Sequence, residues 1–102
     1  MRVISRRALR EFWELNPQAK EPLSAWFRIV ERSDFPNFGA IKQAFGAADF
    51  VPPYTVFDIG GNKFRIIATI HYNRERMYIR YVFTHAEYDR WSKQLQRQGK
   101  KR

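Results

Sequence analysis

His85 and Tyr88 lie three residues apart near the end of this 102-residue chain, a spacing that puts both side chains on one side of a helix. Cleavage of RNA by its own 2′-hydroxyl needs a base for the hydroxyl proton, an acid for the leaving 5′-oxygen, and cations for the charge that grows on the phosphate. Imidazole and phenol groups can carry out the two proton transfers. Arg65, in a preceding strand, could hold the scissile phosphate in two-pronged fashion. These three residues predict phosphodiester chemistry.

The sequence around His85 indicates that this histidine opens the last helix. Thr84 and Glu87 have the spacing of a capping box, which predicts a helix that continues to about Leu95. The positive end of the helix dipole favours a neutral imidazole that can accept a proton, and the free backbone amides attract a phosphate. Asp89, four residues after His85, is either a surface acid or a partner for Arg65.

Four further residues are predicted to bind RNA: Asn62, Lys63, Tyr78 and Arg80. Lys63 and Arg80 would hold neighbouring phosphates, and Tyr78, like Tyr54, could stack on a base. Each has a simpler interpretation, because Lys63 could pair with Asp58, Arg80 could be a solvated strand residue, and the tyrosines could pack across strands. Their convergence on one face of a sheet favours the functional interpretation.

Two hairpins are expected to bring these residues together. If residues 73–76 form a four-residue loop, the two strands around it pair as Tyr72–Met77, Ile67–Val82 and Arg65–Thr84. Gly60-Gly61 predicts a two-residue turn into the middle strand, which gives the pairs Asp58–Lys63, Val56–Arg65 and Phe57–Phe64.

Alternation along the strands separates a core face from an open face. The predicted core face comprises Phe57, Phe64, Ile66, Ala68, Ile70, Tyr72, Met77, Ile79, Tyr81 and Phe83. The open face carries the cations and the polar Thr69 and His71, with Ile67 and Val82 as its apolar insertions.

The first half of the chain predicts helices. Residues 2–4 could form a short strand, and Ser5 caps a helix to about Leu15 with a buried stripe of Ala8, Leu9, Phe12 and Trp13. A second helix follows Asn16-Pro17 and buries Leu23, Trp26, Phe27 and Val30. Pro22 leaves open whether this helix starts later or bends. Residues 33–53 are expected to be loop with a brief helix at 41–45, and residues 54–59 a strand.

The predicted fold class is α+β: a small antiparallel sheet with an N-terminal helical hairpin packed on one face and a C-terminal helix. At 102 residues the chain is expected to be one domain, 1–102, with a basic tail at 96–102 that frays.

The composition is basic and rich in aromatic residues. Nineteen Lys and Arg against ten Asp and Glu give a formal charge of +9, and 17% of the residues are aromatic. Cations neutralise phosphates and rings stack on bases, so nucleic acid is the expected partner. Without cysteine there is no thiolate metal site, and the two histidines lack a carboxylate pattern suited to zinc, so neither a metal nor a cofactor is expected. No membrane span or signal peptide is evident, which favours a cytoplasmic protein.

Three runs of residues resemble the HigB toxins, a branch of the RelE-like bacterial ribonucleases. They are the segment 56–65 with its glycine hairpin, Tyr78-Ile79-Arg80, and residues 84–89 with the Thr-His-x-Glu-Tyr-Asp end; the likeness extends to about Leu95. The resemblance implies a ribosome-dependent mRNA interferase of a type II toxin–antitoxin system, silenced by a HigA-type helix-turn-helix antitoxin. It matches the strand arginine of the family to Arg65, the basic residue before it to Lys63, and the terminal catalytic cluster to His85 and Tyr88.

Two other interpretations remain open. A non-catalytic RNA-binding or ribosome-associated module would use the same basic face without cutting. A structural protein that binds a partner through its helices would make the basic face incidental, and solvent-exposed Trp13 or Trp26 would support it. If the protein is the ribosome-dependent enzyme, affinity for ribosomal RNA could come from Arg6, Arg7, Arg10 and residues 100–102.

Overall fold

A computed structural model of the protein describes residues 1–100, with side chains described as far as Arg97. The elements follow in the order β1 (Arg2–Ile4), α1 (Arg6–Leu15), α2 (Lys20–Arg32), α3 (Phe38–Ala44), β2 (Asp49–Val51), β3 (Tyr54–Ile59), β4 (Phe64–His71), β5 (Arg76–Thr84) and α4 (His85–Lys100). One five-stranded sheet has the order β1-β5-β4-β3-β2, in which β1 runs parallel to β5 and the other neighbours are antiparallel. The α+β class predicted from the sequence is confirmed.

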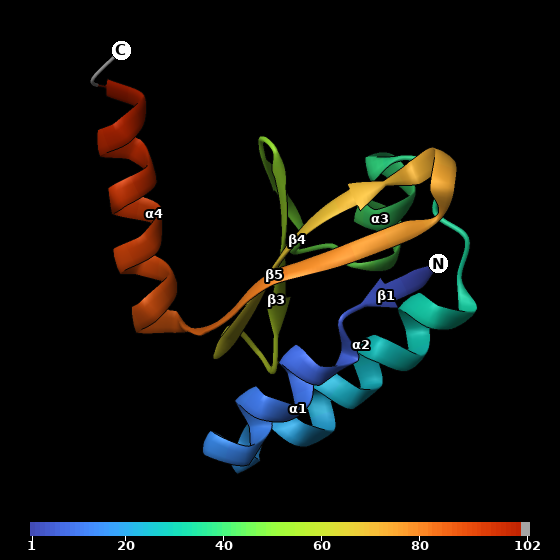
Figure 1. Ribbon diagram of the computed structural model, residues 1–102, viewed down its shortest axis with the longest axis horizontal. Coiled ribbons are helices and arrows are strands. Elements are labelled where there is room, and N and C mark those ends of the chain that lie inside the picture. The colour runs from blue at the N-terminus through green and yellow to red at the C-terminus, as the bar shows by residue number, and fades with distance from the viewer. Residues whose placement is uncertain (101–102) are drawn as a thin grey trace.

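Helices α1, α2 and α3 cover one face of the sheet, and α4 lies on the opposite side of the molecule from α1 and α2 (Figure 1). Aromatic contacts hold α1, α2 and the residue that follows α3 to that face. The contacting pairs are Phe12–Phe64, Trp26–Phe57 and Phe45–Phe57, with ring centroids 5.2–5.6 Å apart. The hydrophobic core of the described residues therefore lies between these helices and the sheet.

The helical hairpin forms as the sequence predicts. The side chain of Ser5 caps α1 by accepting a hydrogen bond from the backbone N–H of Arg7 at 3.1 Å. A short 3₁₀ turn at Pro17–Ala19 precedes α2, so the helix starts later than Pro17, at Lys20. Pro22 then lies in the first turn of α2, where backbone N–H groups have no partner within the helix and proline is tolerated. Trp26 is only 2% exposed and Trp13 packs against the core, so neither supports the partner-binding interpretation.

The register predicted for the β4–β5 hairpin is wrong. The connection occupies residues 72–75, one position earlier than expected, because Tyr72–Arg74 form a 3₁₀ turn and Glu75 takes a left-handed conformation at φ 54°. The observed pairs near the turn are His71–Arg76 and Ile70–Met77, and those near the other end are Ile67–Tyr81, Ile66–Val82, Arg65–Phe83 and Phe64–Thr84. The predicted pairs Tyr72–Met77, Ile67–Val82 and Arg65–Thr84 do not form.

A β-bulge at Arg80 changes which face the end of β5 presents. Ala68 pairs with Ile79 and Ile67 pairs with Tyr81, so Arg80 is the extra residue on β5. Beyond the bulge, Val82 packs against the core, whereas Tyr81 and Phe83 face the side of α4. The core positions predicted for Tyr81 and Phe83, and the open position predicted for Val82, are therefore wrong.

The turn between β3 and β4 is longer than predicted. Its loop comprises residues 60–63, and the observed pairs are Ile59–Phe64, Asp58–Arg65, Phe57–Ile66 and Val56–Ile67, instead of Asp58–Lys63, Val56–Arg65 and Phe57–Phe64. The shift is an even number of residues, so the faces of both strands stay as predicted. Its main consequence is that Asp58, rather than Val56, lies opposite Arg65.

Two further segments differ from the sequence-based expectation. Residues 49–51 form the edge strand β2, which the sequence predicted as loop. Helix α4 continues past Gln96, where a frayed tail was expected, and ends at Lys100; Lys101 and Arg102 lie outside the described residues. None of the helices in the described part of the chain has the length and apolar character needed to cross a membrane.

Candidate functional site

Arg65 is held in a polar enclosure between the β3–β4 turn and α4. It is 7% exposed, and its Nε lies 2.7 Å from Asp58 Oδ1. Its Nη1 donates to the backbone oxygens of Asn62 at 3.1 Å and Phe64 at 3.2 Å, and its Nη2 donates to the side-chain oxygen of Asn62. The guanidinium lies over the ring of Tyr88, with Cζ 5.2 Å from the centroid. Arg65 is therefore buried, as a paired charge that ties three segments together.

The turn that encloses Arg65 needs three successive left-handed residues. Gly60, Gly61 and Asn62 have φ values of 66°, 63° and 78°. Glycine adopts this conformation without a Cβ clash, and asparagine tolerates it better than most other residues. The third left-handed residue lengthens the loop and brings the carbonyl and the side chain of Asn62 to the guanidinium of Arg65.

The start of α4 is fixed to the same turn. Thr84 and Glu87 form the predicted capping box: the backbone N–H of Thr84 donates to Glu87 Oε1 at 2.8 Å, and that of Glu87 donates to Thr84 Oγ1 at 3.3 Å. The backbone N–H of His85 donates to the carbonyl of Lys63 at 3.0 Å. The first turn of the helix therefore lies beside the residues that surround Arg65, as the sequence indicated.

His85 is paired with Asp89 on the surface of α4. Its Nδ1 lies 3.2 Å from Asp89 Oδ2, and both side chains are about half exposed, at 50% and 52%. Of the two sequence-based alternatives for Asp89, the surface acid is the one observed: its carboxylate contacts His85, and Arg65 pairs with Asp58 instead. The carboxylate faces Nδ1, so Nε2 is the ring nitrogen left for a substrate.

The side chain of Tyr88, a residue of α4, packs between this helix and the sheet, and the pKa of its phenol is perturbed. Burial raises the pKa of its phenol above the ordinary 10.0, the positive charge of Arg65 lowers it, and Asp49 raises it further, with smaller effects from Ser92 and Asp58. The net direction is upward, so the phenol keeps its proton at neutral pH. A protonated phenol can donate to a leaving oxygen.

Trp91 anchors α4 to the open face of the sheet through a cluster of aromatic rings. The Trp91 ring lies 5.3–6.0 Å from each of its four neighbours in this cluster: Tyr54, Tyr81, Phe83 and Tyr88. Tyr81 and Phe83 also stack on each other at 5.2 Å. Such contacts fix the position of α4 and hence of His85 and Tyr88.

The four predicted RNA-binding residues lie on or beside the open face. Lys63 and Asn62 are exposed in the turn, although the Asn62 side chain is engaged by Arg65. Arg80 is exposed, donates from Nε to Thr69 Oγ1 at 2.9 Å, and lies 5.3 Å from the Tyr78 ring. Lys63 adjoins the His85 end of the face, whereas Arg80 and Tyr78 lie farther along β5 toward β1.

Two features of the site were missed in the sequence. The role of Asp58 as the partner of Arg65 depends on the longer turn, and the only signal for that turn is the asparagine directly after Gly60-Gly61. The aromatic cluster was missed because Tyr81 and Phe83 were assigned to the core.

Within residues 1–97, no three His, Asp or Glu side chains gather closely enough to hold a metal ion.

The fold and the site define a small basic α+β domain with an arginine, a tyrosine and a histidine gathered at the start of its last helix. A sequence model of the HigB toxin family, described as the RelE-like toxic component of a toxin–antitoxin system, matches residues 19–91. The chain belongs to this family.

Two relatives illustrate the likeness. The mRNA interferase toxin HigB of Escherichia coli strain K12 is 32% identical over a 104-residue alignment that covers 99% of this chain and 100% of the relative. The mRNA interferase HigB of Escherichia coli strain CFT073 is 29% identical over 93 residues, which cover 88% of this chain and 90% of the relative.

Proposed function

We propose that this protein is an mRNA interferase: an endoribonuclease that cleaves messenger RNA on the ribosome by attack of the 2′-hydroxyl on the adjacent phosphate, with no metal ion required. Membership of the HigB toxin family supports the proposal, and so do the full-length relatives named mRNA interferase. The observation that carries it is the junction of α4 with the β3–β4 turn, where the guanidinium of Arg65 lies over the Tyr88 ring and the backbone N–H of His85 donates to Lys63.

His85 is assigned the role of general base. Asp89 stands on the Nδ1 side of the ring and orients it, so Nε2 would take the proton from the 2′-hydroxyl. The positive end of the α4 dipole and the exposed Lys63 would attract the scissile phosphate to this position, although the backbone N–H groups of His85 and Glu87 already donate to Lys63 and Thr84.

Tyr88 is assigned the role of general acid. Its raised pKa keeps the phenol protonated, and its place three residues after His85 on α4 lets both groups reach one phosphodiester. Proton donation to the 5′-oxygen would leave a 2′,3′-cyclic phosphate on one product and a 5′-hydroxyl on the other.

Direct clamping of the phosphate by Arg65 stays a prediction. Three hydrogen bonds and an ion pair already hold the guanidinium, which favours a positioning role: Arg65 keeps Tyr88 against the turn and adds positive charge beside the reacting group. Asn62 acts with it, while Arg80 and Tyr78 would contact RNA farther from the cut.

The proposed partners follow from the same assignment. A toxin of this family is the partner of an antitoxin, and we propose a HigA-type helix-turn-helix protein in that role. Translating ribosomes and messenger RNA would place the activity in the cytoplasm. The exposed Arg6, Arg7 and Arg10 would strengthen association with ribosomal RNA.

The test compares the wild type with His85→Ala and Tyr88→Phe, using His71→Ala as the matched control. His71 is the other histidine of the chain and is exposed at the far end of β4 from the turn. Cleavage of messenger RNA on purified ribosomes is measured by mapping RNA ends. We expect His71→Ala to cut like the wild type and the two site variants to lose on the order of a hundredfold or more in rate.

Two results would contradict the proposal. If His85→Ala and His71→Ala cut equally well, the site assignment fails. If the wild type binds ribosomes without cutting, the protein is a non-catalytic RNA-binding module, the alternative raised by its sequence.

A further inference from the structure

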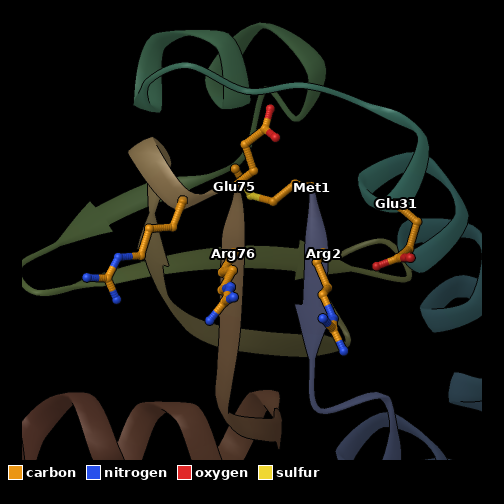
Figure 2. Close-up of a pocket in the computed structure, with 6 residues that line it drawn as sticks. Met1, Arg2, Glu31, Glu75 and Arg76 are labelled. Carbon is orange, nitrogen blue, oxygen red and sulfur yellow. The ribbon is translucent and has the colours of Figure 1, made fainter.

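The edge strand β1 and its neighbour β5 carry two arginines in direct register. Strand β1 pairs with β5 in parallel, with Arg2 opposite Arg76. Figure 2 shows the two side chains extending side by side in the same direction from their strands, while Glu75 points away from them. Val3 and Met77 are buried on the helical face, so Arg2 and Arg76 lie on the open face. Like charges on adjacent strands repel, which an anion between them would relieve.

The acids nearby do not neutralise this pair. Glu31 and Glu75 line the same cavity of about 370 Å³ as the two arginines. Glu31 Oε2 accepts the backbone N–H of Val3 at 2.8 Å, and the pKa of Glu75 is raised chiefly by a hydrogen bond with the carboxyl of Asp34. Neither acid forms an ion pair with an arginine within the described residues.

Strand β5 connects this pair with the proposed active site along one face. Between Arg76 and Thr84 it presents Tyr78, Arg80 and Tyr81, of which Tyr81 is 42% exposed. Cations alternating with rings supply the phosphate neutralisation and base stacking that single-stranded nucleic acid binding uses. At about 3.3 Å per residue, the strand separates the two ends by roughly 26 Å, enough for several nucleotides.

We propose that Arg2 and Arg76 form a second phosphate-binding site for single-stranded RNA, and that an RNA strand cut at His85 runs along β5 to reach it. Arg74, which lines the same cavity, adds a third guanidinium. This inference rests on the proposed function, because it names how the substrate of that site continues along the sheet. Because cations and aromatic rings alternate in one row along β5, they match the phosphates and bases of an RNA strand better than they match the surface of an acidic protein.

The test measures RNA binding without cleavage. In a His85→Ala background, Arg2→Gln with Arg76→Gln is compared with Arg28→Gln with Arg32→Gln, which removes the same charge from exposed positions on α2. The probe is a fluorescently labelled single-stranded RNA oligonucleotide of about ten nucleotides, within the site sizes usual for such proteins, followed by anisotropy at several salt concentrations. The first pair is expected to weaken binding by about tenfold and to reduce the magnitude of the slope of log affinity against log salt by about 1.4, while the control pair keeps the slope of the His85→Ala protein.

Thermal unfolding separates this effect from misfolding. Removing two repelling charges should leave the melting temperature of the Arg2/Arg76 variant equal to or above that of the control. Inorganic phosphate should raise the melting temperature of the His85→Ala protein more than that of the Arg2/Arg76 variant.

Equal RNA affinity and salt slope for the two double variants would overturn the second site. If the salt slopes of the two double variants differ but the wild type does not cleave RNA, the second site stands and the nuclease assignment fails. If the wild type cleaves RNA but the slopes are equal, the nuclease assignment stands and the second site fails. If Arg2→Gln with Arg76→Gln loses binding to an acidic peptide but keeps its binding to RNA, a protein and not RNA occupies this edge.

Discussion

Replacing Arg65 is expected to destabilise the protein, so a loss of activity in the variant would not by itself show a catalytic role. Arg65→Ala removes three hydrogen bonds and leaves the carboxylate of Asp58, whose side chain is 28% exposed, without its partner. Removing one member of a buried ion pair typically costs about 3–5 kcal/mol. Because water partly reaches Asp58, we expect about 3 kcal/mol of the free energy of unfolding to be lost.

That loss is large for a chain of this size. The free energy of unfolding of a small domain is about 5–15 kcal/mol, and 1 kcal/mol shifts the melting temperature by about 4–8 °C. Arg65→Ala should therefore melt about 12–24 °C below the wild type. A variant that no longer arrests growth could simply be unfolded, so growth assays alone cannot assign Arg65 to catalysis.

Asp58→Asn distinguishes a positioning arginine from a phosphate clamp. If Arg65 positions Tyr88, removing the negative charge loosens the enclosure, and both the free energy of unfolding and the cleavage rate fall. If Arg65 clamps the phosphate, Asp58→Asn frees the guanidinium for RNA, and the rate is kept or rises. Urea unfolding gives the free energy, and single-turnover cleavage on ribosomes, measured below each melting transition, gives the rate. A fully stable Asp58→Asn variant with undiminished cleavage would refute the positioning role.

Three further perturbations follow from the described contacts. Trp91→Ala should lose about 2 kcal/mol, because the half-buried ring holds α4 to the sheet, and urea unfolding checks the value; an unchanged free energy would mean that α4 is held by other contacts. The raised pKa of Tyr88 predicts that its acid role persists through neutral pH and declines only above its ordinary value of 10.0, so a decline in the cleavage rate near neutral pH that Tyr88→Phe abolishes would argue against the assignment. The pKa of Glu75 is raised in the folded state by Asp34, so its contribution to stability is complete below the ordinary value of 4.5 and is lost as pH rises through the raised value; Glu75→Gln should flatten that part of a plot of melting temperature against pH, and an unaltered plot would exclude the shared proton.

Local signals in the sequence were sufficient for the starts of α1 and α4. The Ser5 cap and the Thr84–Glu87 capping box act within one helical turn, so their side chains specify the helix starts wherever the rest of the chain lies. The faces of β3 and β4 were likewise predictable, because neither strand carries an extra residue and successive side chains of a strand point to opposite faces.

The register was not predictable, because it depends on backbone choices that the alternation does not encode. Either a two-residue or a four-residue loop follows β3 with the same faces, and only the left-handed Asn62 selects the longer one. In β5, the residues around Arg80 alternate equally well with or without a bulge. The bulge is settled by what the distant Trp91 packs against, which is a tertiary contact.

The bulge at Arg80 matters for the site more than any single side chain at its surface. Without the extra residue, Tyr81 and Phe83 would point to the helical face, and Trp91 would lose two of the rings on which α4 rests. The capping box would still start the helix after Thr84, but little would hold its next turn against the Arg65 enclosure. Arg80 itself lies on the open face beside Thr69, as a regular ladder also predicts, in line with the proposed RNA path. One extra residue in β5 thus gives α4 the rings against which it packs. A regular ladder, the simplest prediction from the sequence, identifies the residues of the site but not the contacts that hold α4 beside them.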